Sequence, residues 1–275
     1  METEREVAAH YSRTGLEASI LEALRSAGVD IDRLTPADLA GADEFHLGWR
    51  PATAALAGDL GLRAGMHVLD VGSGIGGPAR HFADAYGCTV AGIDLTADYV
   101  NVATALTRRC GLGDRVSFQQ ASALAMPFAA GSFDAATLIH VGMNIEDKTA
   151  LFTEVRRALK RDGLFGVYDV MRLDDTPLTY PMPWAQTSAT SYVETPATYR
   201  KALEDAGFAI LQEHDRAPLA IELGRAMREK AARDGIPPLG LHILMGPAGG
   251  ERMANVFAAL HGGQIAPTAI VARAI

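Results

Sequence analysis

The sequence is poor in cysteine and has no cluster of metal-binding residues. Only two of its 275 residues are cysteine, Cys88 and Cys110, and neither belongs to a C-x-x-C pair or a Cys/His cluster. A disulfide-stapled fold is therefore excluded, and a reducing, cytoplasmic setting is expected. Cys, His, Asp and Glu nowhere have the spacing of metal ligands, so no metal is expected.

Runs of basic or apolar residues are also absent. The formal net charge is −8 and no stretch is rich in Lys or Arg, so binding to nucleic acid or to an anionic membrane surface is not expected. No apolar run approaches the ~20 residues of a transmembrane helix. The charged start, METEREVAAHYS, lacks the apolar segment of a secretory signal. The sequence leaves open whether the protein is a homo-oligomer.

Two parts of the chain differ in pattern. Residues 1–60 are predicted to form a helical N-terminal lid, with helix over residues 4–28, and residues 61–275 to form the main domain. In the main domain short apolar runs alternate with helical patterns, which predicts an α/β fold with a mostly parallel sheet and helices on both faces. The predicted strands up to residue 171 are 66–72, 89–95, 116–122, 133–140 and 164–171.

Helix ends and insertions complete the prediction. A helix is expected over residues 146–163, with Asn144 and Asp147 as a capping pair. Residues 172–195 and 216–264 are long insertions, the second with two helical patterns. Insertions of this kind often build a pocket or lid, which makes them a candidate helical substrate cap; surface elaboration is the alternative.

A glycine-rich turn follows the first predicted strand. Gly72, Gly74 and Gly77 have G-x-G-x-x-G spacing, and Asp94 ends the next strand 20 residues after Gly74. Such a turn lets a ligand approach the backbone, and a carboxylate at that place can hold the hydroxyls of a ribose. Both features fit a dinucleotide such as NAD.

Asp70, two residues before the first glycine, favours a different ligand. Its carboxylate is expected just under the turn, where it would repel a pyrophosphate. S-adenosylmethionine (SAM) has no phosphate and carries an ammonium and a sulfonium, which a carboxylate would attract. The residues therefore favour SAM over NAD.

Several stretches resemble the class I SAM-dependent methyltransferases over roughly residues 60–215. They are VLDVGSGIGG, GIDL, AMPFAAGSFD and EVRRALKRDGLFGVYD. A closer resemblance to the sarcosine/dimethylglycine methyltransferase group is carried by DEFHLGWRPAT, HVGMNIEDK and YPMPWA, and a weaker one to phosphoethanolamine methyltransferases by HYSRTGLEASIL. The resemblance implies a Rossmann-like sheet of seven strands in the order 3-2-1-4-5-7-6, with the last strand antiparallel.

The resemblance also implies a cofactor site for SAM, with S-adenosylhomocysteine as product. Gly72 and Gly74 would face the methionine part, Asp94 would hold the ribose and Leu95 would pack on the adenine. Where the family usually has an acidic residue for the adenine amino group, this chain has Ser122, a weaker neutral acceptor. The full set of implied cofactor residues is Phe45, His46, Asp70, Gly72, Gly74, Asp94, Leu95, Ser122, Ala123 and His140.

Two residues are candidates for the chemistry. His140 is expected at the carboxyl end of a strand, where it is either a general base or a pocket wall. Tyr11 matches a tyrosine that closes the site in phosphoethanolamine methyltransferases, or is an ordinary residue of an amphipathic helix. A neutral amine needs no base during attack, whereas a hydroxyl, phenol or carbon acid often does.

Four further residues are candidates for substrate binding. Trp184 and Tyr192 could box an ammonium or an aromatic ring, or simply pack their loop. Asp169 could bind an amine or cap a helix, and His242 could line the roof of a pocket or lie in the core. The hypothesis is a SAM-dependent methyltransferase of a small-molecule acceptor, an amine or natural-product-type metabolite. Alternatives are an O- or C-methyltransferase with His140 as base, a non-catalytic SAM-binding protein and, more remotely, an NAD oxidoreductase.

Overall fold

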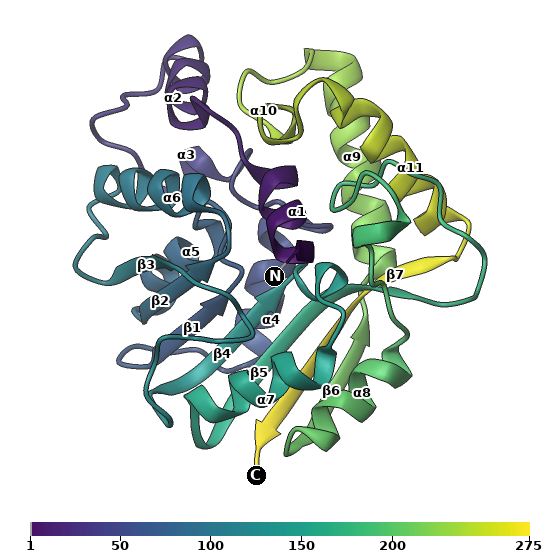
Figure 1. Cartoon of the computed structure of the whole chain (residues 1–275). Coiled ribbons are helices and arrows are strands. Elements are labelled where there is room, and N and C mark those ends of the chain that lie inside the picture. The colour runs from purple at the N-terminus through teal and green to yellow at the C-terminus, as the bar shows by residue number, and fades with distance from the viewer. Residues whose placement is uncertain (1) are drawn as a thin grey trace.

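The computed structural model describes residues 2–275, and its centre is a seven-stranded sheet (Figure 1). The strands follow the order β3-β2-β1-β4-β5-β7-β6, in which β7 is antiparallel to β5 and β6 and the remaining neighbours are parallel. This confirms the predicted topology. The strands are β1 His67–Val71, β2 Thr89–Asp94, β3 Val116–Gln120, β4 Phe133–Ile139, β5 Leu159–Arg172, β6 Phe208–Asp215 and β7 Ile265–Ala274.

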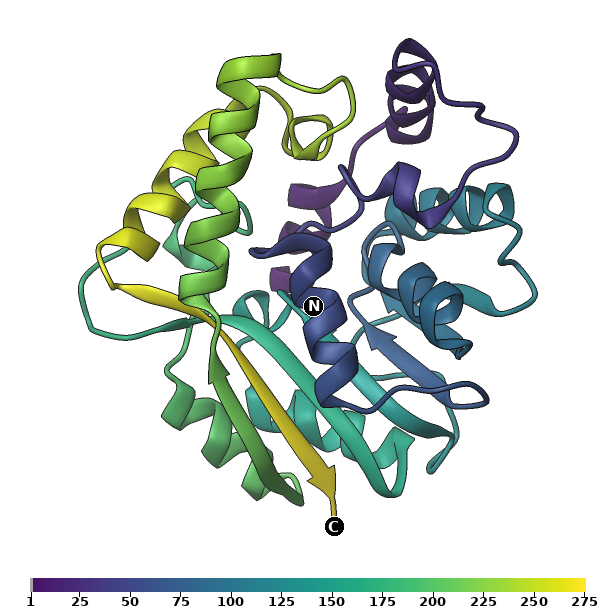
Figure 2. The ribbon, with the colours of Figure 1, turned by 180° about the vertical axis from the view of Figure 1, so that it is seen from behind.

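Helices cover both faces of the sheet. Helices α7 and α8 lie on the face seen in Figure 1, whereas α4 lies on the opposite face, seen in Figure 2. Helix α4, although it belongs to the N-terminal 60 residues, packs on the sheet. The helices are α1 Glu2–Tyr11, α2 Leu16–Ser26, α3 Pro36–Leu39, α4 Trp49–Asp59, α5 Gly77–Tyr86, α6 Ala97–Arg109, α7 Lys148–Ala158, α8 Pro196–Asp205, α9 Ala217–Asp234, α10 Leu241–Met245 and α11 Gly249–His261.

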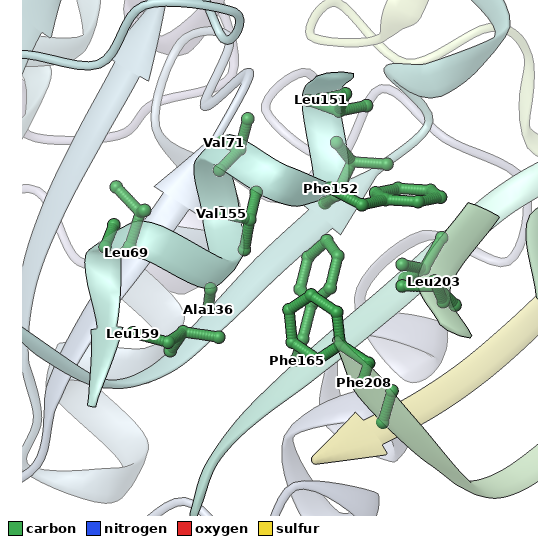
Figure 3. Close-up of a cluster of buried hydrophobic side chains, with 14 of the residues drawn as sticks. Leu69, Val71, Ala136, Leu151, Phe152, Val155, Leu159, Phe165, Leu203 and Phe208 are labelled. Atoms are coloured by element: carbon green, nitrogen blue, oxygen red, sulfur yellow. The ribbon is translucent and has the colours of Figure 1, made fainter. Parts of the chain in front are cut away.

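Side chains that alternate along each strand pack into two apolar cores, one on each face of the sheet. Along β1, Leu69 and Val71 point to the face of α7 and α8, where they lie in one apolar cluster with Phe152 and Phe165 (Figure 3). Val68 points to the opposite face and packs with residues of α4 and α5. Successive residues of a strand face opposite sides, so a buried sheet needs apolar residues at consecutive positions.

Two predicted helices end differently from expectation. The helix predicted over residues 4–28 breaks into α1 and α2, because Gly15 adopts a left-handed conformation with φ 76°. The helix predicted over residues 146–163 is shorter: α7 ends at Ala158 and the chain continues directly as β5. Asp147 caps α7 by accepting the Ala150 N–H at 2.8 Å, whereas Asn144 lies in a 3-10 turn and binds other segments.

The segments outside the sheet gather over its carboxyl end. Helices α1, α2, α9, α10 and α11 lie there together with the connection over residues 172–195 (Figures 1 and 2). That connection is fixed by backbone bonds, such as Tyr192 N–H to the Met143 carbonyl at 2.7 Å. No helix in the described part of the chain has both the length and the apolar character needed to cross a membrane.

Candidate cofactor and acceptor site

A cavity of about 380 Å³ lies where the parallel strands end. Its walls come from the glycine turn after β1, the ends of β2, β3 and β4, helix α1 and the cap formed by residues 172–195 and α10–α11. Twelve of the fifteen candidate site residues from the sequence lie in the lining. They are Tyr11, Phe45, His46, Asp70, Gly72, Gly74, Asp94, Leu95, Ser122, Ala123, His140 and Trp184.

Three substrate-binding candidates lie outside the lining. Asp169 is fully buried behind it and accepts the Tyr199 hydroxyl at 2.7 Å; burial raises the pKa of its carboxyl to about 6. Tyr192 turns its hydroxyl to the Ala189 carbonyl within its own loop. His242 is exposed, which also corrects the expectation of a core histidine, because its neighbours on α10 face the cavity instead.

The glycine turn is held by the end of strand β2. The Gly72 and Ser73 N–H groups both donate to the Ile93 carbonyl at 2.8 Å, and Gly74 N–H donates to the Asp94 carboxylate at 2.9 Å. A Cβ on Gly72 would lie 2.3 Å from the Val141 side chain, and φ of Gly72 is +71°. Glycine is therefore required at position 72 by both space and conformation.

The third glycine of the motif has a different purpose. A Cβ on Gly77 would lie 1.9 Å from the Asp43 carbonyl oxygen, so this glycine lets the segment before α4 pack closely on α5. The Asp43 carboxylate then pairs with the buried Arg80 guanidinium at 2.8 Å. Gly77 therefore positions a wall of the cavity rather than a ligand, as Gly77 itself is absent from the lining.

The Asp70 carboxylate is buried and only half satisfied. One oxygen accepts the Thr137 hydroxyl at 2.8 Å, while Oδ2 has no hydrogen-bond partner among residues 2–275. Burial raises the pKa of this carboxyl to about 7, and the negative charges of Glu44 and Asp94 act in the same direction. A carboxylate oxygen without a partner beside a cavity suits a cationic ligand group, because a charge-assisted hydrogen bond to that group would offset the cost of burying the carboxylate.

The segment around residues 44–47 is fixed by buried charges. The Glu44 carboxylate accepts hydrogen bonds from His46 Nε2 at 3.0 Å, the Thr53 hydroxyl at 2.6 Å and Arg50 Nε at 2.6 Å. Although burial opposes ionisation, these contacts lower the pKa of Glu44 to about 2. The adjacent Phe45 is half-buried and faces the cavity.

His140 has both ring nitrogens engaged. Nδ1 lies 3.2 Å from the Tyr168 carbonyl, which can only accept, and Nε2 lies 3.2 Å from the Leu47 N–H, which can only donate. The proton is therefore on Nδ1, and the lone pair of Nε2 is used by Leu47. Burial, with a smaller effect of His46, holds the pKa of His140 well below its usual range.

Tyr11 connects α1 to the cap through a residue that the sequence did not single out as part of the site. Its hydroxyl donates to Asn144 Oδ1 at 3.0 Å, and Asn144 Nδ2 donates to the Trp184 carbonyl at 2.9 Å. Burial raises the pKa of Tyr11 well above its usual range. Other lining residues that the sequence did not reveal include Glu4, Val7, Ser73, Tyr99, Met143, Pro183, Met253 and Val256. Several lie in segments without a motif, so only their apolar character was a signal.

The charge of the lining is of one sign. Its ionisable residues besides histidine and tyrosine are Glu4, Asp43, Asp70, Asp94, Glu146 and Asp147, and none of the described residues that line the cavity is Lys or Arg. Asp147 is occupied as the cap of α7. Among the described residues, no group of three or more His, Cys, Asp or Glu side chains could hold a metal ion.

Comparison with known proteins gives the family of the domain. Residues 69–167 match the family described as "Methyltransferase domain". The methyltransferase GfsG of Streptomyces halstedii is 33% identical over 57% of this chain and 57% of its own length. A sterol 24-C-methyltransferase of Gibberella zeae is 38% identical over 43% of this chain and 31% of its own. Phosphoethanolamine N-methyltransferase 1 of Triticum aestivum is 34% identical over 63% of this chain and 35% of its own. The chain thus spans between 31% and 57% of the length of these three relatives.

Solved structures share the fold at low sequence identity. Geranyl diphosphate C-methyltransferase from Streptomyces coelicolor has a TM-score of 0.69 and 17% identity, covering 100% of this chain and 99% of that one. Phosphoethanolamine N-methyltransferase 2 of Haemonchus contortus has a TM-score of 0.68 and 22% identity, covering 84% and 54%. The [4+2]-cyclase SpnF has a TM-score of 0.62 and 23% identity, covering 93% of each chain. Residues 69–167 thus match a methyltransferase domain, and the seven-stranded sheet that contains them has the fold of these solved structures.

Proposed function

We propose that this chain is a SAM-dependent methyltransferase that transfers a methyl group by in-line displacement to a small apolar amine lacking phosphate. The observation that carries the proposal is that one cavity joins the glycine turn after β1 to an apolar wall provided by the cap. An enzyme that moves a methyl group between two small molecules needs both in one enclosed space, because alignment is most of the catalysis.

The half of the cavity at the glycine turn fits SAM. The unpaired Asp70 oxygen would receive the ammonium, Asp94 would hold the ribose hydroxyls, and Leu95 would pack on the base. When bound, SAM supplies a methyl group activated by the sulfonium, and S-adenosylhomocysteine is the product. A pyrophosphate would meet the Asp70 charge under the turn, which disfavours NAD.

The other half of the cavity indicates the class of acceptor. Trp184, Leu244, Met253 and Val256 supply an apolar wall from the cap. A phosphate or diphosphate on the acceptor would find acidic residues and no Lys or Arg in the described lining, whereas phosphate recognition relies on such cations. A molecule with an amine is favoured by the same charges. This feature separates the proposed acceptor from the phosphorylated compounds named for two of the relatives.

The absence of a free base among the candidates also favours an amine. Nε2 of His140 is used by the Leu47 N–H, and burial raises the pKa of Tyr11, so the phenol keeps its own proton and is not available as a base. A neutral amine attacks with its own lone pair, so desolvation and orientation suffice. His140 would then act by holding the segment at Leu47 over the cavity. As a general base for oxygen or carbon it would first have to release Leu47.

A second candidate function is a SAM-binding protein without methyl transfer. The likeness to SpnF supports it, since a protein named as a [4+2]-cyclase has the same fold. The test is a panel of amines, phenols, other hydroxyl compounds and phosphorylated analogues, with S-adenosylhomocysteine formation followed by mass spectrometry. The proposal expects turnover of apolar amines and none of their phosphorylated analogues. Tight cofactor binding with no turnover of any acceptor would favour the non-catalytic function.

The role of His140 is tested in the same assay with His140→Asn. Asparagine tolerates the left-handed backbone that His140 adopts at φ 53°, so the strand end should keep its shape. With an amine acceptor kcat should fall less than ~5-fold, and the rate should still rise with pH along the amine's own pKa. If kcat instead falls ~10²–10⁴-fold, the rise of the rate with pH disappears and cofactor affinity is unchanged, His140 is assigned as the general base.

A further inference from the structure

Helix α1 places a carboxylate at the end of the cavity beyond Asp94. Glu4 Oε1 accepts the Ser122 hydroxyl at 2.5 Å, although the two residues are 118 positions apart, and both line the cavity. The Ser122 oxygen also accepts the Leu124 N–H at 3.1 Å. Because its one proton is directed to Glu4 and one lone pair to Leu124, Ser122 is a weakened acceptor for a ligand, and the carboxylate is the stronger one.

The position of this pair follows from the sheet. Strands β2 and β3 are parallel neighbours, with Asp94 beside Gln120, so Ser122 lies just past the end of β3 next to Asp94. The Ala121 N–H bonds to the Asp94 carbonyl at 3.0 Å, and the Gln120 amide bonds to the Leu95 carbonyl at 3.1 Å. A nucleoside whose ribose is held by Asp94 would therefore extend its base over Leu95 toward Ser122 and Glu4.

The chemistry of this end selects the base. Leu95, Ala123 and Leu124 line the cavity there with apolar surface, which suits the face of a purine. A carboxylate only accepts hydrogen bonds, so it favours a base whose edge carries an amino group and repels one with a carbonyl at the same place. We propose that Glu4, on α1, accepts the exocyclic amino group of adenine and thereby makes the N-terminal helix part of the cofactor site. The inference rests on the proposed function.

The carboxylate can reach this place only while α1 is docked. Tyr11, at the other end of α1, is bonded to Asn144, and His10 contacts the Pro183 carbonyl at 3.0 Å. Val7, between them and Glu4, also lines the cavity. Helix α1 therefore contacts the proposed adenine end of the cavity, its middle and the cap. Recognition of the base and enclosure of the acceptor would thus depend on the same helix.

The test compares S-adenosylhomocysteine with S-inosylhomocysteine, which differs by a carbonyl in place of the amino group. Calorimetry should show that the unmodified protein prefers the adenine compound by at least ~10-fold, the scale of one hydrogen bond to a charged group. In Glu4→Gln the preference should fall below ~3-fold, because an amide can either accept or donate. The ratio of the two ligands cancels any general loss of affinity caused by loosening α1.

Glu6→Gln is the matched control, since Glu6 is exposed on the same helix, and it should keep the full preference. A preference that persists unchanged in Glu4→Gln, or a protein that binds both compounds equally before any mutation, would overturn the role of Glu4 while leaving the proposed function in place. Binding of neither compound would overturn the proposed function and this inference with it.

Discussion

The two halves of the cavity are built by different means. In the half at the glycine turn, the turn itself is made within one stretch of chain: the Gly74 N–H bonds to Asp94, 20 residues later, and Gly72 and Ser73 bond to Ile93. The acceptor half is assembled across the whole sequence. Tyr11 reaches Asn144 over 133 positions, and the Arg13 guanidinium reaches the Leu244 carbonyl over 231.

This difference teaches where the site is rigid and where it can adapt. Backbone bonds between adjacent strands hold the glycine turn as part of the sheet, which has few alternatives. The cap is attached through scattered backbone and side-chain bonds and an apolar cluster, carried by long connections between sheet elements. Connections of this kind are the segments that vary and move most. We therefore expect cofactor affinity to depend on a few polar groups, and acceptor selection on the shape of the cap.

The largest effect expected in the cofactor half concerns Asp70. Because its pKa of about 7 exceeds the value of an unfolded aspartate, the folded state holds its proton more firmly. The stability that this provides is fully present below pH ~4 and is lost as the pH rises to ~7. Relative to Asp70→Asn, the ligand-free protein should thus lose about 3 kcal/mol between pH 5 and pH 8, measured by urea unfolding.

Asp114→Asn serves as the control for that measurement, because Asp114 is exposed. The difference in free energy of unfolding between Asp114→Asn and the unmodified protein should not change with pH. Asp70→Asn should also bind S-adenosylhomocysteine more weakly than the unmodified protein does. Asp70 would then favour ligand binding while lowering the stability of the ligand-free protein at neutral pH. A flat pH dependence would contradict the charge assigned to this site.

A smaller effect is expected for Asp94→Ala. Removing the carboxylate deletes the partner of the Gly74 and Thr96 N–H groups and the proposed ribose acceptor. Cofactor affinity should fall by ~10–150-fold, which is ~1.5–3 kcal/mol, with little change in KM for the acceptor at saturating cofactor. Calorimetry measures the first quantity and steady-state kinetics the second. Unchanged cofactor affinity would refute the assignment of Asp94.

The smallest effect is expected in the cap, for Trp184→Phe. Trp184 is buried, lines the cavity and donates its indole N–H to the Ser191 hydroxyl at 2.9 Å. Phenylalanine keeps an apolar ring but is a weaker partner for a cation, so KM for an amine should rise ~5-fold. S-adenosylhomocysteine affinity should stay within ~2-fold. His242→Ala, in the same cap but exposed, should change neither; equal losses for both ligands in Trp184→Phe would break the division into two halves.

The placement of the residues around the glycine turn was largely predictable because they are close in sequence and follow strand ends. A glycine turn after one strand and an acid after the next meet at the same edge of any parallel sheet. The acceptor half was not. Asp169 and Tyr192 are of residue types that could bind an amine, and they lie near a strand end and in the cap loop. Hydrogen bonds to Tyr199 and Ala189 nevertheless hold their polar atoms outside the cavity.

The strand order within the sheet was implied by the resemblance to the methyltransferases. What the residues determined by themselves is the order of strands and helices along the chain and the placement of Gly72, Gly74, Asp70 and Asp94 around one turn. Periodicity and turn chemistry act over short distances, so the local chain carries that information. Only the tertiary structure decided that Nε2 of His140 is used by Leu47, that Asn144 meets Tyr11 of α1, and that Glu4 lies beside Ser122. Each of these contacts joins residues 93 or more positions apart, and which side chains meet over such distances is set by packing of the whole chain.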